Sequence, residues 1–313
     1  MKRILICAAA AIVALASCSK TQVVYNDAPE EIGFKAVTGV MTKAPVTDTS
    51  FPEGQIMTVY AWNNDGHAAY FGPVDFEKDG ASWSGGDNPQ YYPSIGALDF
   101  VAYTKHSVVT MTTTPLEHDT YAYTLANNTE EQHDFMVSDY VVNNSKSVSP
   151  VTLPFHHALA LIEINFKCTG TTVQINSVNL TNTKQQGTVS VSYTVTDKDT
   201  DNNTPVIGTW DVSGAPNKDC SKTENLNLTA DADYVNYARF LVVPESGANK
   251  TLTVNYTLNG NRFSHDIDVD ANSAHEWAVG TKHIFNITIG LEEITFNPNV
   301  AIWTDDTETI PSI

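Results

Sequence analysis

Short stretches in which apolar and polar residues alternate recur from one end of the chain to the other. LTVNYTLN at 252–259 is typical, and Val, Ile, Thr and Tyr, which favour extended backbone, are frequent in these stretches. Alternation with period two places one face of a strand in a core and the other towards solvent. It predicts strands at 57–62, 97–104, 108–114, 121–125, 133–142, 151–155, 159–166, 173–182, 187–195, 239–244, 252–259, 263–269 and 283–289. No convincing segment of helical period competes with them, so the fold class is expected to be all-β.

Turn-forming residues separate the predicted strands. Asn64-Asp65-Gly66 and Asn259-Gly260-Asn261 are examples, and many short strands joined by such turns are typical of β-sandwiches. A chain of 313 residues is long enough for two domains. The polar segment NNSKSVSP at 143–150 ends in proline and precedes a long apolar strand. We therefore expect an N-terminal domain at 44–149 and a C-terminal domain at 150–313.

The first residues have the pattern of a secretory signal. The basic pair Lys2-Arg3 precedes an apolar run that ends at Ala16 and is too short to cross the roughly 30 Å of a bilayer core as a helix. Leu15-Ala16-Ser17-Cys18 resembles the bacterial lipobox, in which a signal peptidase cuts before the cysteine and lipid is attached to it. Residues 1–17 would then be removed, and the acyl chains on Cys18 would hold the protein on a membrane. The alternative is an ordinary signal followed by an incidental cysteine.

The chain is strongly acidic. It has 36 Asp and Glu against 17 Lys and Arg, a net charge of −19, and after the pair Lys2-Arg3 the basic residues are scattered singly. Such a surface repels nucleic acid, which we therefore do not expect as a partner. Cys7 lies in the signal and Cys18 at the expected lipid site, so Cys168 and Cys220 are the only pair that could form a disulfide. The sequence leaves open whether they do.

Patterns that could carry catalysis or bind a metal are weak. His156 and His157 are adjacent on a predicted strand, so their rings point to opposite faces and cannot chelate one metal together. The acidic segment at 196–203 has calcium-loop spacing but lacks the turn glycine and the final glutamate, and HDIDVD at 265–270 is typical of a strand with an acidic outer face. No nucleophile, zinc or nucleotide-binding motif is present. We expect neither an enzyme nor a cofactor.

A strand with one apolar face is predicted near the N-terminus, at about 31–40. EIGFKAVTGV alternates there, and the exposed-looking Lys43-Ala44 follows it. The side chains expected on the apolar face are Ile32, Phe34, Ala36, Thr38 and Val40.

A second such strand is predicted within about 293–303, in EITFNPNVAIW. Its alternate side chains are Ile294, Phe296, Pro298, Val300 and Ile302. Proline cannot complete a ladder on both sides, so Pro298 indicates an edge strand. A terminal edge strand is easily exchanged between molecules, but it could equally complete its own sandwich without a partner.

These features together resemble the fimbrillin family, the type V pilins of Bacteroidales. The resemblance covers nearly the whole mature chain. It rests on the order and spacing of five segments: the lipobox Leu15–Cys18, Phe34 followed by Thr42-Lys43-Ala44, Tyr91-Tyr92-Pro93 followed by Leu98–Tyr103, Phe155-His156-His157-Ala158-Leu159-Ala160, and Trp277-Ala278-Val279-Gly280 leading into Ile284–Ile289.

The resemblance implies two tandem transthyretin-like β-sandwich domains, exported as a lipoprotein precursor to the outer membrane. In this family an Arg- or Lys-specific surface protease removes the N-terminal strand, and the terminal strand of another fimbrial subunit fills the groove that opens. Carried onto this chain, residues 18–43 would be a propeptide, cleavage would separate Lys43 from Ala44, the removed strand would be 31–40, and the donor would lie within 293–303. Lys20 and Lys35 are competing lysines.

The leading function is therefore a structural, non-catalytic subunit of a cell-surface fimbrium. The alternative is a lipid-anchored adhesin or glycan-binding protein that does not polymerise, with Trp62, Trp83 and Trp210 exposed for stacking on sugars. The sequence leaves open whether these tryptophans are surface or core residues.

Overall fold

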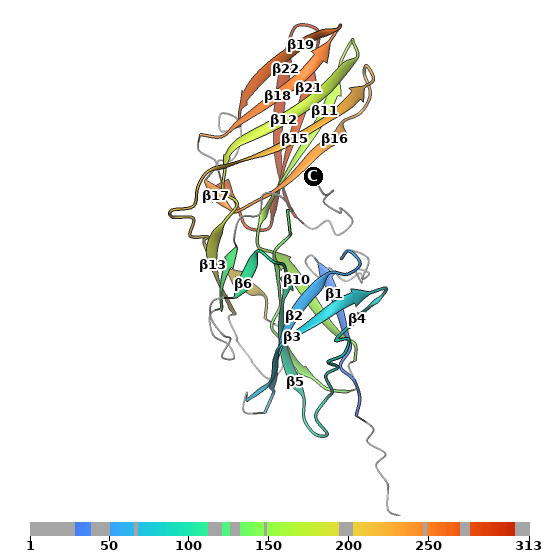
Figure 1. Ribbon diagram of the computed structural model, residues 1–313, viewed down its shortest axis with the longest axis vertical. Helices are drawn as coiled ribbons and strands as arrows, with labels where there is room; N and C mark the ends of the chain where they lie inside the picture. Colours follow the sequence, from blue (N-terminus) through green and yellow to red (C-terminus); the bar gives the residue numbers. More distant parts are fainter. Residues whose placement is uncertain are drawn as a thin grey trace, which may run out of the picture.

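The computed structural model describes residues 29–38, 51–65, 68–111, 121–125, 132–146, 149–193, 203–246, 249–269 and 276–303. Strands connected by turns make up these ranges and no α-helix occurs in them, which confirms the all-β class. No helix that could span a bilayer is found in this part of the chain. The strands form an elongated molecule with a lower body, a middle layer and an upper body (Figure 1).

The lower body is a closed ring of strands. Its sheet has the order β2-β3-β4-β1-β10-β8-β5-β9, and an additional pairing of β2 with β5 closes the ring. The bounds are β1 Phe34–Thr38, β2 Ile56–Asn63, β3 Ala69–Asp79, β4 Ser82–Ser84, β5 Leu98–Lys105, β8 Met136–Ser138, β9 Val141–Asn144 and β10 Val151–His157. One hydrophobic cluster, which we call the ring core, contains Phe34, Phe76, Trp83, Phe100 and Phe155.

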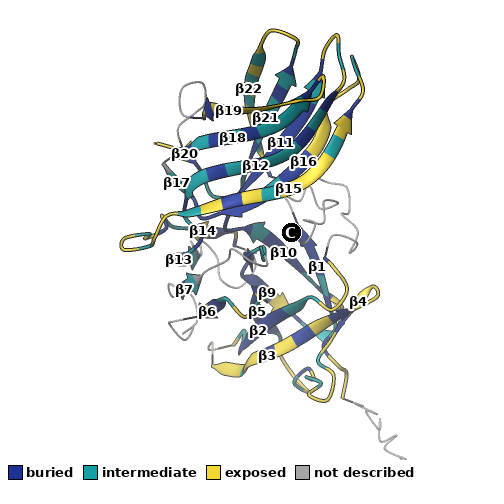
Figure 2. Cartoon of the chain, turned by 45° about the horizontal axis from the view of Figure 1, so that its top comes forward, coloured by how far each residue is buried: buried dark blue, intermediate teal, exposed yellow. Residues whose placement is uncertain are grey.

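The upper body consists of two four-stranded sheets. One has the order β16-β11-β21-β22 and the other β15-β12-β18-β19, and a single hydrophobic cluster takes residues from both. Burial alternates along β15, as period-two strands require (Figure 2). The bounds are β11 Ala160–Cys168, β12 Val173–Thr183, β15 Lys218–Leu228, β16 Val235–Val242, β18 Thr251–Leu258, β19 Asn261–Asp268, β21 Thr281–Ile289 and β22 Ile294–Ile302. A small pair, β17 Glu245–Ser246 with β20 Glu276–Trp277, lies below them.

The middle layer joins the two bodies. Its sheet has the order β14-β13-β7-β6, with β6 Val109–Met111, β7 Tyr121–Leu125, β13 Gly187–Tyr193 and β14 Pro205–Ile207. A third hydrophobic cluster, the joint core, combines residues of this sheet with residues of the ring and of β11 and β16.

The expected boundary after residue 149 lies at the entry to β10. β10 pairs with β1 and β8 in the ring, and β13 pairs with β7 in the middle layer. Backbone pairings thus connect residues on the two sides of the expected boundary, and the division into domains stays a prediction.

Each predicted strand overlaps a strand of the structure, but the prediction of one strand at 133–142 was wrong. The segment holds the short β8 and the start of β9, separated by Asp139 and Tyr140. The physical reason is a change of partner, because Tyr140 leaves the ring ladder and exchanges both backbone hydrogen bonds with Asn203, at 2.8 and 2.9 Å.

Candidate site at the two terminal strands

β1 supplies buried side chains to the ring core. Phe34, Ala36 and Thr38 of β1 and Ile32 just before it are all buried, with Phe34 only 1% exposed. The fifth residue of the predicted face, Val40, lies outside the described residues, as do Lys43, Ala44 and Cys18.

Phe34 is the aromatic anchor of β1. Its ring meets Phe76 of β3 at 4.8 Å and Phe100 of β5 at 5.3 Å between centroids, both edge to face. This geometry is the favourable one for aromatic pairs. The sequence predicted the strand that carries Phe100 but missed β3 and therefore Phe76, so the two partners of Phe34 were not foreseen together.

The two edges of β1 are held unequally. Along one edge, Phe34–Thr38 pair in parallel with Val151–Phe155 of β10. Along the other edge, the strand pairs with β4 only at Phe34 and Trp83. Just before the strand, Ile32 N–H donates to the Gln90 carbonyl at 2.8 Å. The ring therefore has a short ladder between β1 and β4, and removal of β1 would leave β10 with an unpaired edge.

β22 is an edge strand. It pairs in the antiparallel direction with β21 from Ile289↔Ile294 to Thr281↔Ile302, and no strand of the described residues pairs with its other side. Ile294 and Phe296 pack against the core of the upper body, whereas Val300 is 43% and Ile302 72% exposed. The edge position that Pro298 indicated is what the structure has.

The end of β22 is fixed by Trp303, which sequence reasoning did not single out. Its indole stacks on His157 with centroids 3.5 Å apart and planes 6° apart, and His157 Nδ1 lies 2.7 Å from Asp134 Oδ2. His156 points elsewhere, with Nε2 2.7 Å from Asp139 Oδ1. The expectation that the two rings serve opposite faces is met, and the stack connects β22 to the joint core.

The three tryptophans that could have stacked on sugars are core residues. Trp62, Trp83 and Trp210 are each less than 5% exposed. Trp210 Nε1 donates to the Ala158 carbonyl at 2.8 Å, as buried indoles usually require a partner. A glycan platform built from them is contradicted by this burial.

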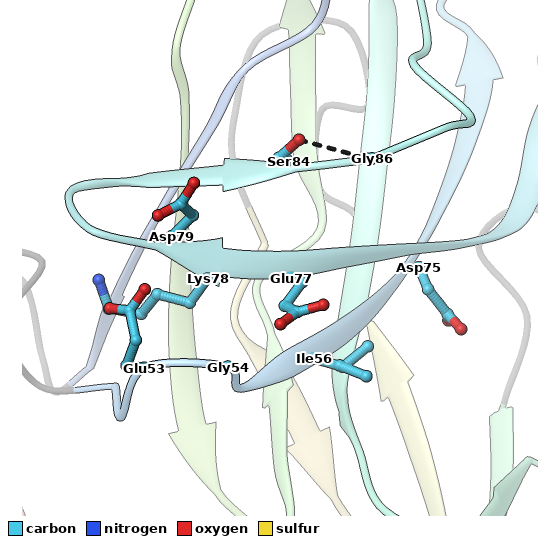
Figure 3. Close-up of a pocket in the computed structure, with 10 residues that line it drawn as sticks. Glu53, Gly54, Ile56, Asp75, Glu77, Lys78, Asp79, Ser84 and Gly86 are labelled. Atoms are coloured by element: carbon cyan, nitrogen blue, oxygen red, sulfur yellow. Dashed lines mark hydrogen bonds between the residues drawn. The ribbon is translucent and has the colours of Figure 1, made fainter.

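The described residues include an acidic pocket of about 530 Å³ on the outside of the ring, lined by β3 and the turns beside it. Figure 3 shows Asp75, Glu77 and Asp79 spread along β3 and Glu53 on the segment before β2. Two are already engaged: Glu53 accepts from Gly80 N–H at 3.0 Å, and Asp75 accepts from Thr58 Oγ1 at 2.7 Å. In the described ranges no group of three or more His, Cys, Asp or Glu side chains could hold a metal ion.

Cys168 and Cys220 are buried free thiols, which answers the question of their pairing. Burial raises the pKa of Cys220 to about 11, so its thiol stays protonated at neutral pH. The carboxylates of the weak calcium-like loop, Asp197, Asp199 and Asp201, lie outside the described residues. On β19, Asp266 and Asp268 are exposed and Ile267 is buried, as the alternation predicted.

A comparison with protein-family models decides the family. The model described as fimbrillin-like matches residues 42–303. The chain belongs to the fimbrillin-like family. The resemblance found in the sequence is thereby confirmed, and a comparison of this fimbrillin-like chain with curated proteins finds no match.

Solved structures of similar fold come from Bacteroides. A proposed cell adhesion protein of Bacteroides uniformis has 19% identity and a TM-score of 0.53, with 88% of this chain and 98% of that chain covered. One from Bacteroides ovatus has 16% identity, a TM-score of 0.53 and the same coverage. A fimbrial protein of Bacteroides vulgatus has 16% identity and a TM-score of 0.52, with 88% and 99% covered. At these identities the likeness concerns the fold alone.

Proposed function

We propose that this fimbrillin-like chain is a structural subunit of a cell-surface fimbrium that polymerises by strand exchange. The single observation that carries the proposal is the position of β1. Together with Ile32 just before it, β1 places three side chains in the ring core, yet it is paired along its full length with β10 alone. β22, at the other end of the chain, is an edge strand with two exposed apolar side chains.

Strand exchange would follow the physics of β-augmentation. An incoming strand takes up main-chain hydrogen bonds along the edge of β10, and its alternate side chains fill the pockets that β1 leaves. Burial of four or five apolar side chains at roughly 1.5–3 kcal/mol each provides about 6–15 kcal/mol before the costs of ordering, as an upper estimate.

Processing would set the time of assembly. In the proposed sequence of events residues 1–17 are removed as a signal, Cys18 is acylated and the precursor is anchored in the outer membrane. An Arg- or Lys-specific surface protease then cuts between Lys43 and Ala44, and propeptide 18–43 leaves with β1. Until that cut, β1 keeps the ring core closed, so assembly waits for arrival at the cell surface. The lipobox and the alternation of 31–40 support this part.

The finer fold assignment belongs to the same proposal. Two tandem transthyretin-like sandwiches at 44–149 and 150–313 are implied by the family resemblance. The separate cores of the lower and upper bodies support two units, with Val151, Leu153 and Phe155 belonging to the core of the lower body. The role proposed for them is structural and extracellular, with no catalytic step.

A lipid-anchored adhesin that does not polymerise is the second candidate. It is favoured by the description of similar structures as proposed cell adhesion proteins. It no longer has the support of Trp62, Trp83 and Trp210, which are buried.

Limited proteolysis of the purified precursor tests the proposal. Trypsin treatment should yield a new N-terminus at Ala44 by mass spectrometry and a ladder of detergent-resistant polymers on a gel. Lys43→Ala should abolish both, and Lys20→Ala, the matched control, should leave both unchanged. A precursor without residues 293–313 should be cleaved but stay monomeric. Polymers that form equally well without 293–313 would contradict the proposal, and cleavage that gives only monomer would favour the adhesin.

A further inference from the structure

The sheet β16-β11-β21-β22 of the upper body has one face in the core and one face outside. On β11 every second residue belongs to the core cluster, so the residues between them form the outer face. One row across this outer face consists of an asparagine from each strand. The backbone pairings place them side by side in the order Asn236, Asn165, Asn286 and Asn297. Asparagine is depleted in strands, so strand propensity does not account for the row.

The first three asparagines form a directed chain of hydrogen bonds. Asn236 Nδ2 donates to Asn165 Oδ1 at 2.9 Å, and Asn165 Nδ2 donates to Asn286 Oδ1 at 3.2 Å. A carboxamide has two donor hydrogens and one acceptor oxygen. Within the described part of the chain, no side-chain hydrogen bond uses Asn236 Oδ1 or Asn286 Nδ2. The chain therefore presents an acceptor at one end and a donor at the other, two strand spacings or about 10 Å apart.

The middle of this amide chain is held rigidly. Asn165 and Glu163 are each only 8% exposed, although they lie on the outer face of the sheet. Asn165 Nδ2 also donates to Glu163 Oε1 at 2.9 Å, and Glu163 Oε2 accepts from Arg239 Nε at 3.3 Å. Buried polar groups that are hydrogen-bonded to one another rigidify a surface. The amide chain is thus preorganised, which lowers the cost of ordering it on binding.

An aromatic side chain lies beside the amide chain. Tyr234, just before β16, reaches across β11 to β21, where its Oη lies 2.9 Å from Thr288 Oγ1. Lys167 of β11 places Nζ 4.6 Å from the centre of the phenol ring. A side chain that crosses a neighbouring strand lies along the sheet, and Tyr234 is 38% exposed. Lys167 and Thr288 pair two residues beyond the asparagine row, so the phenol and the amides are separated by roughly 6.6 Å along the strands.

This combination of groups fits a neutral sugar. A sugar ring has an apolar face of C–H groups, which packs on an aromatic face, and hydroxyl groups, which both donate and accept hydrogen bonds. Anionic ligands are disfavoured by the net charge of −19, as is a second copy of the chain. The cations beside the asparagines are already engaged. Lys167 lies over the Tyr234 ring, and Arg239 is paired with Glu163.

We propose that the outer face of β16, β11 and β21 is a binding site for a neutral oligosaccharide. Tyr234 packs against the C–H face of one sugar ring, Asn236 Oδ1 accepts from a sugar hydroxyl, and Asn286 Nδ2 donates to another. The site goes beyond the proposed function and does not depend on strand exchange, because these three strands include neither terminal strand. On a fimbrium it would recur on every subunit, so that many weak contacts add up to strong attachment.

An array of neutral and anionic oligosaccharides, probed with the uncleaved precursor, tests the inference. Calorimetric titration with the neutral oligosaccharide that gives the strongest signal then measures Kd. Tyr234→Ala should raise Kd at least about tenfold, because the stacking surface is lost. Tyr234→Phe keeps the aromatic face and loses only the contact with Thr288, so it should raise Kd less than about threefold. Asn236→Ala should raise Kd about fivefold, the effect of one lost hydrogen bond.

The matched controls are an exposed tyrosine and an exposed asparagine elsewhere. Tyr70 of the lower body is 37% exposed, and its Oη donates to the Tyr91 carbonyl. Asn225 of β15 is exposed and accepts from Asn176 Nδ2 at 3.1 Å, on the outer face of the other sheet. Tyr70→Ala and Asn225→Ala should leave Kd within about twofold of wild type.

Four results would overturn the inference. They are binding to no neutral oligosaccharide, binding to anionic oligosaccharides alone, an equal loss of affinity in the control variants, and self-association of the uncleaved precursor that Tyr234→Ala abolishes. The last would mean that the face packs on a second copy of the chain. None of these results bears on the proposed function, whose failure would appear as absence of polymers after trypsin cleavage.

Discussion

Phe34 is the side chain on which closure of the ring depends most. It is buried against Phe76 and Phe100, and it stands at the only position where β1 pairs with both of its neighbours. Phe34→Ala should lower the free energy of unfolding of the precursor by about 3–5 kcal/mol, because a buried phenyl ring is lost and a cavity remains. Urea denaturation measures this effect.

The neighbouring Lys35 provides the control for this prediction. Its side chain lies on the other face of β1 and is only partly buried. Lys35→Ala should change the free energy of unfolding by no more than about 0.5 kcal/mol. Equal effects of the two substitutions would show that β1 does not depend on the pocket described for Phe34.

We expect His283 to make the upper body sensitive to acid. Burial lowers its pKa to about 4, and burial followed by the neighbouring His133 lowers that of His106 to about 4 as well. Between the usual value near 6.5 and 4, the unfolded chain binds protons that the folded chain does not. The stability that these two buried neutral histidines contribute is therefore present above about pH 6.5 and is lost as the pH falls towards 4.

We expect His283 to contribute on the order of 1–3 kcal/mol to this loss. Denaturation in urea at pH 7, 5.5 and 4.5 measures it, and His283→Leu should flatten the pH dependence. His265→Leu, at an exposed position on β19, should leave the slope as it is. An unchanged slope in His283→Leu would refute the assignment of the acid sensitivity to this side chain.

At the scale of the element, β22 is an edge strand fixed at its end by one residue. Trp303 is buried and stacked on His157, whereas Ile302 beside it is largely exposed. Trp303→Ala should therefore loosen the strand, and its amide hydrogens should exchange at least about tenfold faster, because the stack that closes local opening is lost.

Ile302→Ala is the matched substitution and should leave the exchange of the β22 amides within about twofold of wild type. Hydrogen exchange read by mass spectrometry on peptides that cover 291–303 distinguishes the two variants. Equal protection of β22 in both would mean that the stack with His157 does not hold the strand.

Alternation with period two was sufficient to find the elements that bury one face, such as β12, β18 and β21. It failed for β15, whose sequence KDCSKTENLNL has few apolar residues. That strand is held in part by amide pairs across the ladder, such as Gln174 Nε2 to Asn227 Oδ1 at 2.8 Å. It also failed for β3, where Gly72-Pro73 and two register shifts near Ala61 interrupt the pattern.

The candidate site was predictable in part. Alternation gave the buried face of β1 correctly from Ile32 to Thr38. It could not give the parallel partner β10, because pairing between segments more than a hundred residues apart leaves no local signal. For the same reason the sequence could not place Trp303 on His157, or decide that Trp83 and Trp210 are core residues.

At the scale of the whole molecule, cleaved subunits (44–313) have 33 Asp and Glu against 12 Lys and Arg, a net charge of −21, and repel one another. Screening by salt reduces this repulsion, with a Debye length that falls from about 30 Å at 0.01 M to about 8 Å at 0.15 M. Polymerisation of the cleaved protein should therefore be several-fold faster at about 0.15 M salt than at about 0.01 M. Light scattering measures the rate, and a rate that falls with salt would indicate an interface dominated by opposite charges.

The elongated shape suits end-to-end assembly, since the ring lies at one end and β22 belongs to the body at the other (Figure 1). A density map of polymers assembled from the trypsin-cleaved chain tests the central claim most directly. The account predicts that the strand between β10 and β4 is residues 294–302 of the neighbouring subunit, parallel to β10. A map in which residues 34–38 still occupy that place, or in which β22 of every subunit remains beside its own β21, would contradict it.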